Sequence, residues 1–261
     1  MEDWNSHPLK GEHFQVRCCV HIINPVVTDG LKDLHDSISK IRSAVRYVRA
    51  SPSRLDRFKI YIKETRMQDV RYVQLDVPTR WNSTYTMLEN AIKFQKGFKR
   101  LGERDNDFAS MQGGVPKNDD WNNAKYITKF LKIFYDITTK MSGSTYVTSS
   151  LYFNERCVIM MTLEKWIGNP DALLGTMAIK MKAKYNKYWG DIKKMNVMIF
   201  IVVILDPQNK FHFVKWGLER ILDKDDVVVL YEKINDTLYK MFDKYRLFLS
   251  EGQKNSAQAT Q

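Results

Sequence analysis

The sequence has few cysteines, no long apolar run and no excess of acidic residues, and each shortage excludes a class of protein. Its three cysteines, Cys18, Cys19 and Cys157, are an odd number and two are adjacent, which does not suit a disulfide framework. We therefore expect a reducing, intracellular compartment. The longest apolar run covers residues 197–205, far short of the ~20 residues that a membrane-spanning helix needs, so we expect no membrane partner.

The short motifs of the common enzyme classes are also missing. The sequence contains no GxxxxGK[ST] or GxGxxG loop, no HExxH and no GxSxG. Cys18 and His21 form a CxxH pair, which is half of a zinc site, but no second Cys/His pair lies at ligand spacing. We therefore predict no metal site and no cofactor. The alternative is a structural motif, in which Cys18 and His21 pack where a strand meets a helix.

Positive charge and apolar residues are plentiful. The chain of 261 residues has 41 Lys and Arg against 30 Asp and Glu, a formal net charge of +11, and 44% of its residues are hydrophobic. Such a chain can bury a core, as one large domain or two small ones. The cationic excess favours a polyanionic partner, with nucleic acid first and an anionic membrane surface second.

Apolar residues recur at helical spacing over most of the chain. A regular seam predicts one long helix and consists of Leu31, Leu34, Ile38, Ile41, Val45 and Val48. Further stripes predict helices over 55–65, 79–101, 119–142, 151–167, 170–189 and 230–248, with a loop at 102–120 and a short strand at 13–20. The predicted fold class is therefore mainly α with one or two short strands. We expect a single domain over residues 1–250 and a disordered tail at 251–261.

The side of the long helix opposite the seam is basic. From Lys40 to Arg71 the sequence has ten basic residues and three acidic ones. We predict that this surface contacts phosphates. The residues assigned to that contact are Arg42, Arg46, Arg49, Arg57, Lys59 and Lys63. The alternative is a solvated helix face, which is what such a run of charge usually means.

A second candidate contact lies in residues 75–88, which read LDVPTRWNSTYTML. An extended segment ends at Pro78, and a helix is predicted to begin near Thr79. Arg80 and Trp81 at this helix start would suit a nucleic-acid strand, with Arg80 at a phosphate and the indole stacked on an unpaired base. On residue type alone, a Trp81 packed in the core is the commoner arrangement.

Three segments, in the same order as in the family, resemble the hAT superfamily of transposases, especially the plant transposase-derived proteins of the Ricesleeper and Daysleeper kind. They are RCCVHIINPVVTDGL at 17–31, TRWNSTYTML at 79–88 after Asp76, and MKAKYNKYWG with ILDPQNKF between 181 and 211. The first departs from the family pattern at Pro25. Together they make a specific signal.

The resemblance implies the helical insertion and flanking part of an RNase H-like fold, in which two Asp and one Glu hold two metal ions for DNA cleavage. None of these acids has a counterpart here. The first two would precede this sequence, the Glu would follow it, and Asp76 and Asp206 match positions that are not catalytic. The amino-terminal BED zinc finger is also missing. The resemblance therefore implies a nuclear, DNA-binding, transposase-derived protein that cuts no strand.

Several alternatives stay open. The chain could belong to a metal-dependent DNA transposase or endonuclease that takes its catalytic acids from a partner chain. It could instead be a structural fragment whose seam, Leu31–Val48, packs on a parent transposase, or a gene remnant without a selected role. The expected partners are DNA, bound with low sequence specificity, and a parent transposase or a second copy of the chain.

Overall fold

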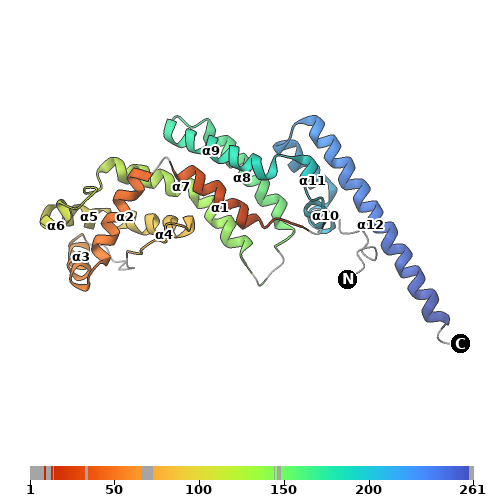
Figure 1. Cartoon of the computed structure of the whole chain (residues 1–261), viewed down its shortest axis with the longest axis horizontal. Helices are drawn as coiled ribbons and strands as arrows, with labels where there is room; N and C mark the ends of the chain where they lie inside the picture. The colour runs from red at the N-terminus through yellow and green to blue at the C-terminus, as the bar shows by residue number, and fades with distance from the viewer. Residues whose placement is uncertain are drawn as a thin grey trace. The chain divides into compact units, whose positions relative to one another are not determined.

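The computed structural model describes residues 15–32, 35–65, 73–143 and 148–258, together with Leu9, His13 and Thr145; for His35 and for 251–258 it describes the backbone alone. Helices are the only regular secondary structure in these residues, and no strand is formed there (Figure 1). The prediction of a mainly α chain is confirmed.

The chain separates into two compact units. Unit 1 consists of Met1–Ile22, Met141–Thr162 and Tyr185–Gln261, and unit 2 of Ile23–Lys140 and Leu163–Lys184. A division into two compact units does not decide whether they form one domain or two. The single domain over residues 1–250 therefore stays a prediction.

Within the described residues before 142 the α-helices are α1 (Cys19–Leu31), α2 (His35–Arg49), α3 (Pro52–Glu64), α4 (Trp81–Lys93), α5 (Gln95–Arg104), α6 (Asn106–Ala109) and α7 (Asn118–Met141). The rest of the described chain forms α8 (Leu151–Ile167), α9 (Ala172–Trp189), the 3-10 helix η3 (Ile192–Lys194), α10 (Met198–Leu205), α11 (Lys210–Ile221) and α12 (Lys224–Gln258).

Side-chain caps explain where several helices begin. The Ser51 hydroxyl accepts a hydrogen bond from the backbone N–H of Arg54 at 3.3 Å, and Pro52 occupies the first helical position of α3, where its missing N–H costs nothing. Asp171 accepts from the N–H of Leu173 at 2.9 Å, so α9 begins two residues after the predicted Pro170.

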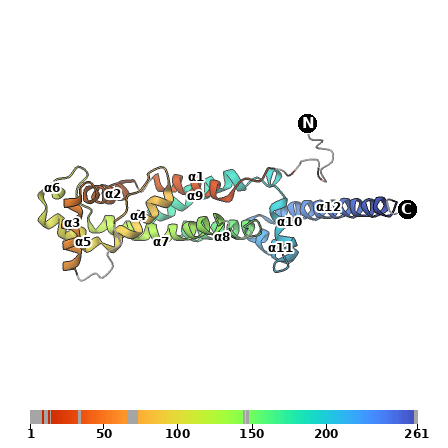
Figure 2. The same cartoon turned by 90° about the horizontal axis from the view of Figure 1, so that it is seen from below.

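Aromatic side chains fill the core of unit 2. The rings of Phe58 and Phe98 lie 4.6 Å apart, between α3 and α5, and these two helices lie side by side in both views (Figures 1 and 2). Gly97 permits this approach, because a Cβ there would lie 3.1 Å from Ile62 Cγ1. Removing these rings from water is the main stabilising contribution to the packing of this helix pair.

The core of unit 1 forms around α8, α10 and α11. The rings of Phe153 and Phe200 lie 5.2 Å apart, and both side chains are buried. A Cβ on Gly217 would lie 2.7 Å from the ring of Phe153, so only glycine fits at this crossing. The longest apolar run of the sequence forms α10 in this core. None of the helices in the described ranges is long and apolar enough to cross a membrane.

The predicted long helix is broken. α1 ends at Leu31 and α2 begins at His35. Gly30 lies in the last turn of α1 without a positive φ, and a Cβ there would lie 2.5 Å from Met181 Cγ, so this glycine permits close packing rather than ending the helix. Leu34, one residue of the seam, lies outside the described residues. Ile41, Val45 and Val48 are fully buried within unit 2. These residues of the seam are therefore not available to pack on a parent transposase, and the structure contradicts that alternative.

The two ends of the described chain also differ from expectation. Residues 15–18 form no strand, and α1 begins at Cys19, inside the predicted strand, because no described strand is there to pair with this segment. Helix α12 continues to Gln258 where a disordered tail was expected from Glu251; the last three residues lie outside the described part. The loop predicted at 102–120 is shorter, since α5 and α6 extend into it.

Candidate nucleic-acid interface

The residues preceding α4 are fixed to α2 by a buried ion pair. Arg42 Nε lies 3.0 and 2.8 Å from the two carboxylate oxygens of Asp76, and Arg42 Nη2 lies 2.8 Å from Asp76 Oδ2. The Asp76 side chain is 1% exposed and also accepts a hydrogen bond from Thr84 at 2.9 Å. Both carboxylate oxygens are thus occupied. Arg42, predicted as a phosphate contact, is instead committed to an internal pair, because releasing it would leave a buried carboxylate unpaired.

Ser83 holds the turn at the start of α4. Its hydroxyl oxygen lies 2.8 Å from the backbone N–H of Val77, which donates to it, and 2.7 Å from the carbonyl of Arg80. Arg80 is the N-cap residue of α4, and its side chain makes no capping hydrogen bond. The side chain of Arg80 is exposed and has no ion pair with any described residue. It is therefore held at its backbone and free at its charged end.

Trp81 lies inside unit 2. Its side chain is 4% exposed, so the alternative of a core tryptophan is confirmed. In this conformation the indole offers no open face to a base. The stacking contact assigned to Trp81 stays a prediction, and it requires the ring to leave the core.

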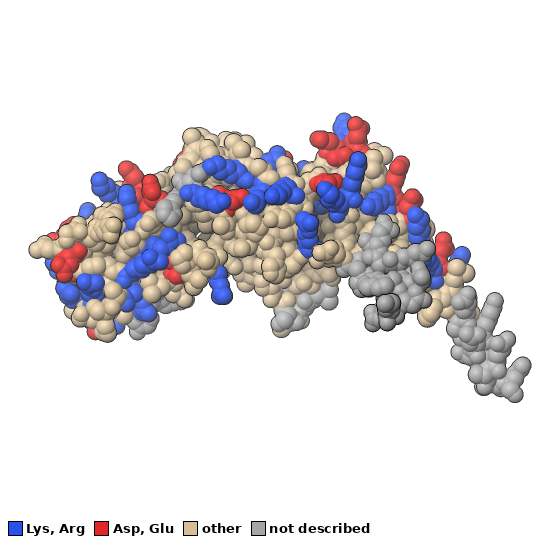
Figure 3. Space-filling model, in the orientation of Figure 1, with Lys and Arg blue, Asp and Glu red and all other residues tan. Residues whose placement is uncertain are grey.

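The predicted cations of α2 and α3 fall into two groups. Arg57 lies 3.4 Å from Asp105, and Lys59 lies 2.8 Å from Asp56, so nearby acids offset part of their charge. Arg46, Arg49 and Lys63 are exposed, and in the described part of the chain none of the three forms an ion pair. Figure 3 shows Lys and Arg side chains gathered over α2. We give the name basic face to the exposed cations that remain of the predicted contact, Arg46, Arg49, Lys63 and Arg80.

Asp105, the partner of Arg57, is itself held by hydrogen bonds. It accepts hydrogen bonds from the Tyr47 hydroxyl at 2.8 Å and from the N–H of Phe108 at 3.1 Å, which makes it the cap of α6. Burial alone would raise the pKa of Asp105, but these hydrogen bonds and the charge of Arg57 outweigh it and lower that pKa. Arg54 lies over the ring of Tyr47 at 4.0 Å, a contact that orients its guanidinium.

Two further cations lie next to the end of α3. Lys96 and Lys99 of α5 are exposed and line a cavity of about 480 Å³ together with Glu64 and Thr65. Glu64 is paired with Arg100 at 2.7 Å and with Arg104 at 3.2 Å. The sequence analysis did not assign Lys96 and Lys99 to the contact, although their spacing of three residues places both on one face of a helix.

The CxxH pair does not pack as expected. Cys18 and His21 are exposed, whereas the intervening Cys19 is 1% exposed, and burial raises the pKa of its thiol to about 12. The helical register explains this, because Cys19 faces inward together with Ile22 and Ile23. The packed thiol of this motif is therefore Cys19. No group of three or more His, Cys, Asp or Glu residues that could hold a metal occurs among the described residues.

Two family models match most of the chain. Residues 16–130 match the ZBED1 RNase-like helical domain, and residues 150–245 match the hAT-like transposase, RNase-H fold. The first match contains the basic face, and the second covers most of α8 to α12. The chain belongs to the hAT superfamily of transposases and transposase-derived proteins, as the three sequence segments predicted.

Its curated relatives are longer proteins. The chain is 28% identical over 265 residues to the Zinc finger BED domain-containing protein RICESLEEPER 2 of Oryza sativa subsp. japonica, covering 98% of this chain and 36% of that protein. It is 31% identical over 221 residues to the Putative AC transposase of Zea mays, covering 84% and 27% of the two chains. It is 24% identical over 190 residues to the Zinc finger BED domain-containing protein DAYSLEEPER of Arabidopsis thaliana, covering 73% and 26%. The chain spans about a third of the length of the curated relatives it matches. No solved structure matches it significantly.

Proposed function

We propose that this chain is a DNA-binding part of a transposase-derived nuclear protein, and that it contacts the phosphate backbone without cutting it. The observation that carries the proposal is the basic face. Arg46, Arg49, Lys63 and Arg80 are exposed, and none of them is paired with an acid in the described residues. Membership of the hAT superfamily and the formal net charge of +11 support the same ligand.

Contacts with phosphates would give the chain affinity for DNA of any base sequence. Cations that replace condensed counterions on DNA gain free energy from the release of those counterions, whatever the base sequence. The cations of the basic face lie on α2, α3 and the start of α4, and each ends in a flexible, exposed side chain. We therefore expect low sequence specificity. Lys96 and Lys99 would extend the contact along α5.

The absence of cleavage is proposed for this chain taken alone. Cleavage by this superfamily uses two Asp and one Glu on two metal ions, and the three segments that resemble the family contain none of these acids. The Putative AC transposase is among the relatives of the chain, so the second candidate is cleavage together with a longer partner chain. Incubating the isolated chain with DNA and Mg²⁺ or Mn²⁺ separates the two, because metal-dependent turnover by this chain would overturn the proposal.

A matched pair of variants tests the binding itself. Arg46→Gln with Arg49→Gln removes two charges from the basic face, and Lys125→Gln with Lys129→Gln removes two exposed charges from α7 of the same unit. Fluorescence anisotropy with a labelled duplex should show roughly tenfold weaker binding for the first pair and little change for the second. Equal losses for both pairs would show that net charge alone, and not the basic face, attracts DNA.

A further inference from the structure

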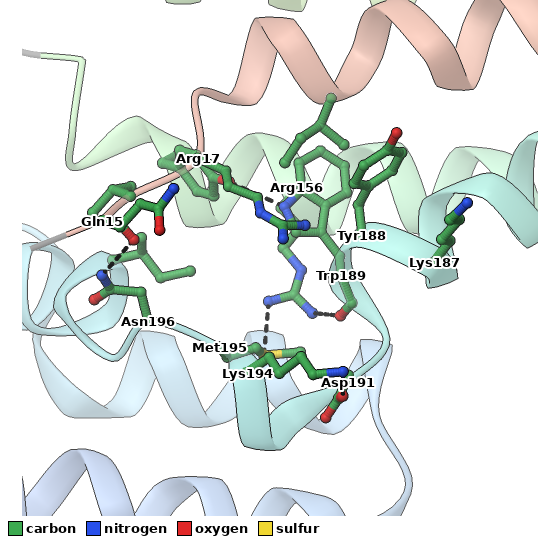
Figure 4. Close-up of a pocket in the computed structure, with 14 residues that line it drawn as sticks. Gln15, Arg17, Arg156, Lys187, Tyr188, Trp189, Asp191, Lys194, Met195 and Asn196 are labelled. Atoms are coloured by element: carbon green, nitrogen blue, oxygen red, sulfur yellow. Dashed lines mark hydrogen bonds and ion pairs between the residues drawn. The ribbon is translucent and has the colours of Figure 1, made fainter. Parts of the chain in front are cut away.

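Unit 1 contains a cavity that the proposed function does not use. Its volume is about 660 Å³, and it lies among the segment before α1, helix α8, the end of α9 and the residues leading to α10 (Figure 4). Its wall includes Arg17, Arg156, Lys187, Tyr188, Lys194 and Asn196. We call it the Arg156 pocket. No residue of the basic face lines it.

Arg156 is a buried cation whose hydrogen-bond acceptors among the described residues are all neutral. Its side chain is 1% exposed. Nε donates to the Tyr185 hydroxyl at 3.2 Å, Nη2 to the carbonyl of Trp189 at 2.8 Å, and Nη1 to the sulfur of Met195 at 3.3 Å.

Each guanidinium nitrogen has one acceptor among the described residues, so three acceptors serve five N–H groups. An arginine side chain has five N–H donors, and a thioether is a weak acceptor. A buried charge is costly unless an opposite charge or a full set of hydrogen bonds compensates it. Arg156 forms no ion pair with a carboxylate in the described part of the chain. An anion in the pocket would supply the missing compensation.

Three further cations, Arg17, Lys187 and Lys194, lie in the wall among mainly neutral residues. Arg17 lies 6.0 Å from the centre of the Tyr188 ring, and the exposed Lys187 follows on α9. The one carboxylate of the lining, Asp191, is paired with Lys194 at 3.0 Å. The hydrogen bond from Lys194 lowers the pKa of Asp191, so this acid stays ionised and offsets mainly Lys194. The charge of the pocket is carried by Arg17, Arg156 and Lys187.

We propose that the Arg156 pocket binds a phosphate group carried by a single nucleotide. Guanidinium groups bind phosphate oxygens through two parallel hydrogen bonds, which makes arginine the usual residue for this anion. The cavity has the size of a small-molecule site, and the ring of Tyr188 beside Arg17 gives a base a surface on which to stack. The nucleotide can come from solution or from the 5′-phosphorylated end of a DNA strand.

Binding to the full chain tests the proposal with defined probes. Calorimetry would compare deoxyadenosine 5′-monophosphate, inorganic phosphate, and a short single-stranded oligonucleotide with and without a 5′-phosphate. Binding of the monophosphate, together with tighter binding of the oligonucleotide when it carries the 5′-phosphate, assigns the pocket to strand ends. Binding of the monophosphate alone assigns it to free nucleotides. If the monophosphate does not bind and the 5′-phosphate adds nothing to the affinity of the oligonucleotide, the proposal is overturned.

Substitutions of exposed residues test the pocket without disturbing the fold, which a change of the buried Arg156 could do. Arg17→Gln with Lys187→Gln should weaken binding of the monophosphate roughly tenfold. Lys193→Gln, an exposed lysine that does not line the pocket, should have little effect. Asp191→Asn should strengthen binding, because it removes the one carboxylate of the wall and frees Lys194. Equal effects of Lys187→Gln and Lys193→Gln, or weaker binding by Asp191→Asn, would contradict a phosphate in this pocket.

Discussion

Arg42 and Asp76 form a bidentate ion pair that joins the middle of α2 to the segment preceding α4. Their side chains are 13% and 1% exposed, and Thr84 adds a hydrogen bond from α4 to the same carboxylate. The pair fixes the extended segment from which Arg80 projects. Arg42, which the sequence analysis assigned to DNA contact, therefore holds the segment before α4 in place instead.

Removing one partner of this pair should destabilise the protein. Arg42→Met leaves the Asp76 carboxylate buried without its cation, which typically costs about 3–5 kcal/mol. Urea unfolding followed by circular dichroism measures the change. Asp136→Asn, which breaks the exposed pair with Lys132, is the control and should barely move the midpoint. An Arg42→Met midpoint equal to that of the control would show that the pair contributes nothing.

The three cysteines should differ in reactivity. Cys18 is exposed, whereas Cys19 and Cys157 are buried and burial raises the pKa of each of their thiols to about 12. The thiolate is the reactive form, so at pH 8 the two buried residues are both shielded and protonated. Mass spectrometry after brief treatment with iodoacetamide should find one modified cysteine in the native protein and three in urea.

The matching control is Cys18→Ala, which should leave the native protein unmodified over the same time. Modification of Cys19 or Cys157 at the rate of Cys18 would show that the start of α1 or the core around α8 is not packed as described.

Asp105 should make stability depend on pH in the acid range. Its pKa is lowered in the folded protein, so between the folded pKa and the usual value of about 3.9 the unfolded chain binds more protons and stability rises with pH. The contribution is complete above the unfolded pKa and is lost as pH falls through the folded one. Asp105→Asn should therefore be less stable than the wild type at pH 7, and the difference should shrink toward pH 3. Urea midpoints of the wild type and of Asp105→Asn at pH 7 and at pH 3 measure this difference in stability. A difference that grows toward pH 3 would contradict the lowered pKa of Asp105.

Helix α12 should mediate association. Tyr239, Phe242, Tyr245 and Phe248 are all more than half exposed and follow one another at intervals of three residues on one helix. At this spacing they wind around about half of the circumference of α12 rather than lie on one face, and exposed aromatic residues at this density are typical of an interface. We expect light scattering to show a mass that rises with concentration, and Phe242→Ser with Phe248→Ser to give a monomer. If the wild type is a monomer at all concentrations, α12 does not mediate association.

Local features of the structure were predictable from sequence, and distant pairings were not. The bounds of α8, Leu151–Ile167, follow from its apolar stretch and the preceding Thr148–Ser150. The break between α1 and α2 was missed because the apolar seam continues across it. The partner of Arg42 lies 34 residues away in sequence, a separation at which periodicity carries no information. The Arg156 pocket was missed for the same reason, since its wall comes from four separate segments.

The salt dependence of DNA binding tests the central proposal most directly. Four phosphate contacts by the basic face predict that the logarithm of the binding constant falls with the logarithm of salt concentration with a slope of about −3 to −4. Arg46→Gln with Arg49→Gln should reduce the magnitude of that slope by about two, while Lys125→Gln with Lys129→Gln should leave it unchanged. A wild-type slope near zero, or a slope that the Arg46 and Arg49 substitutions do not alter, would contradict the assignment of this surface to DNA.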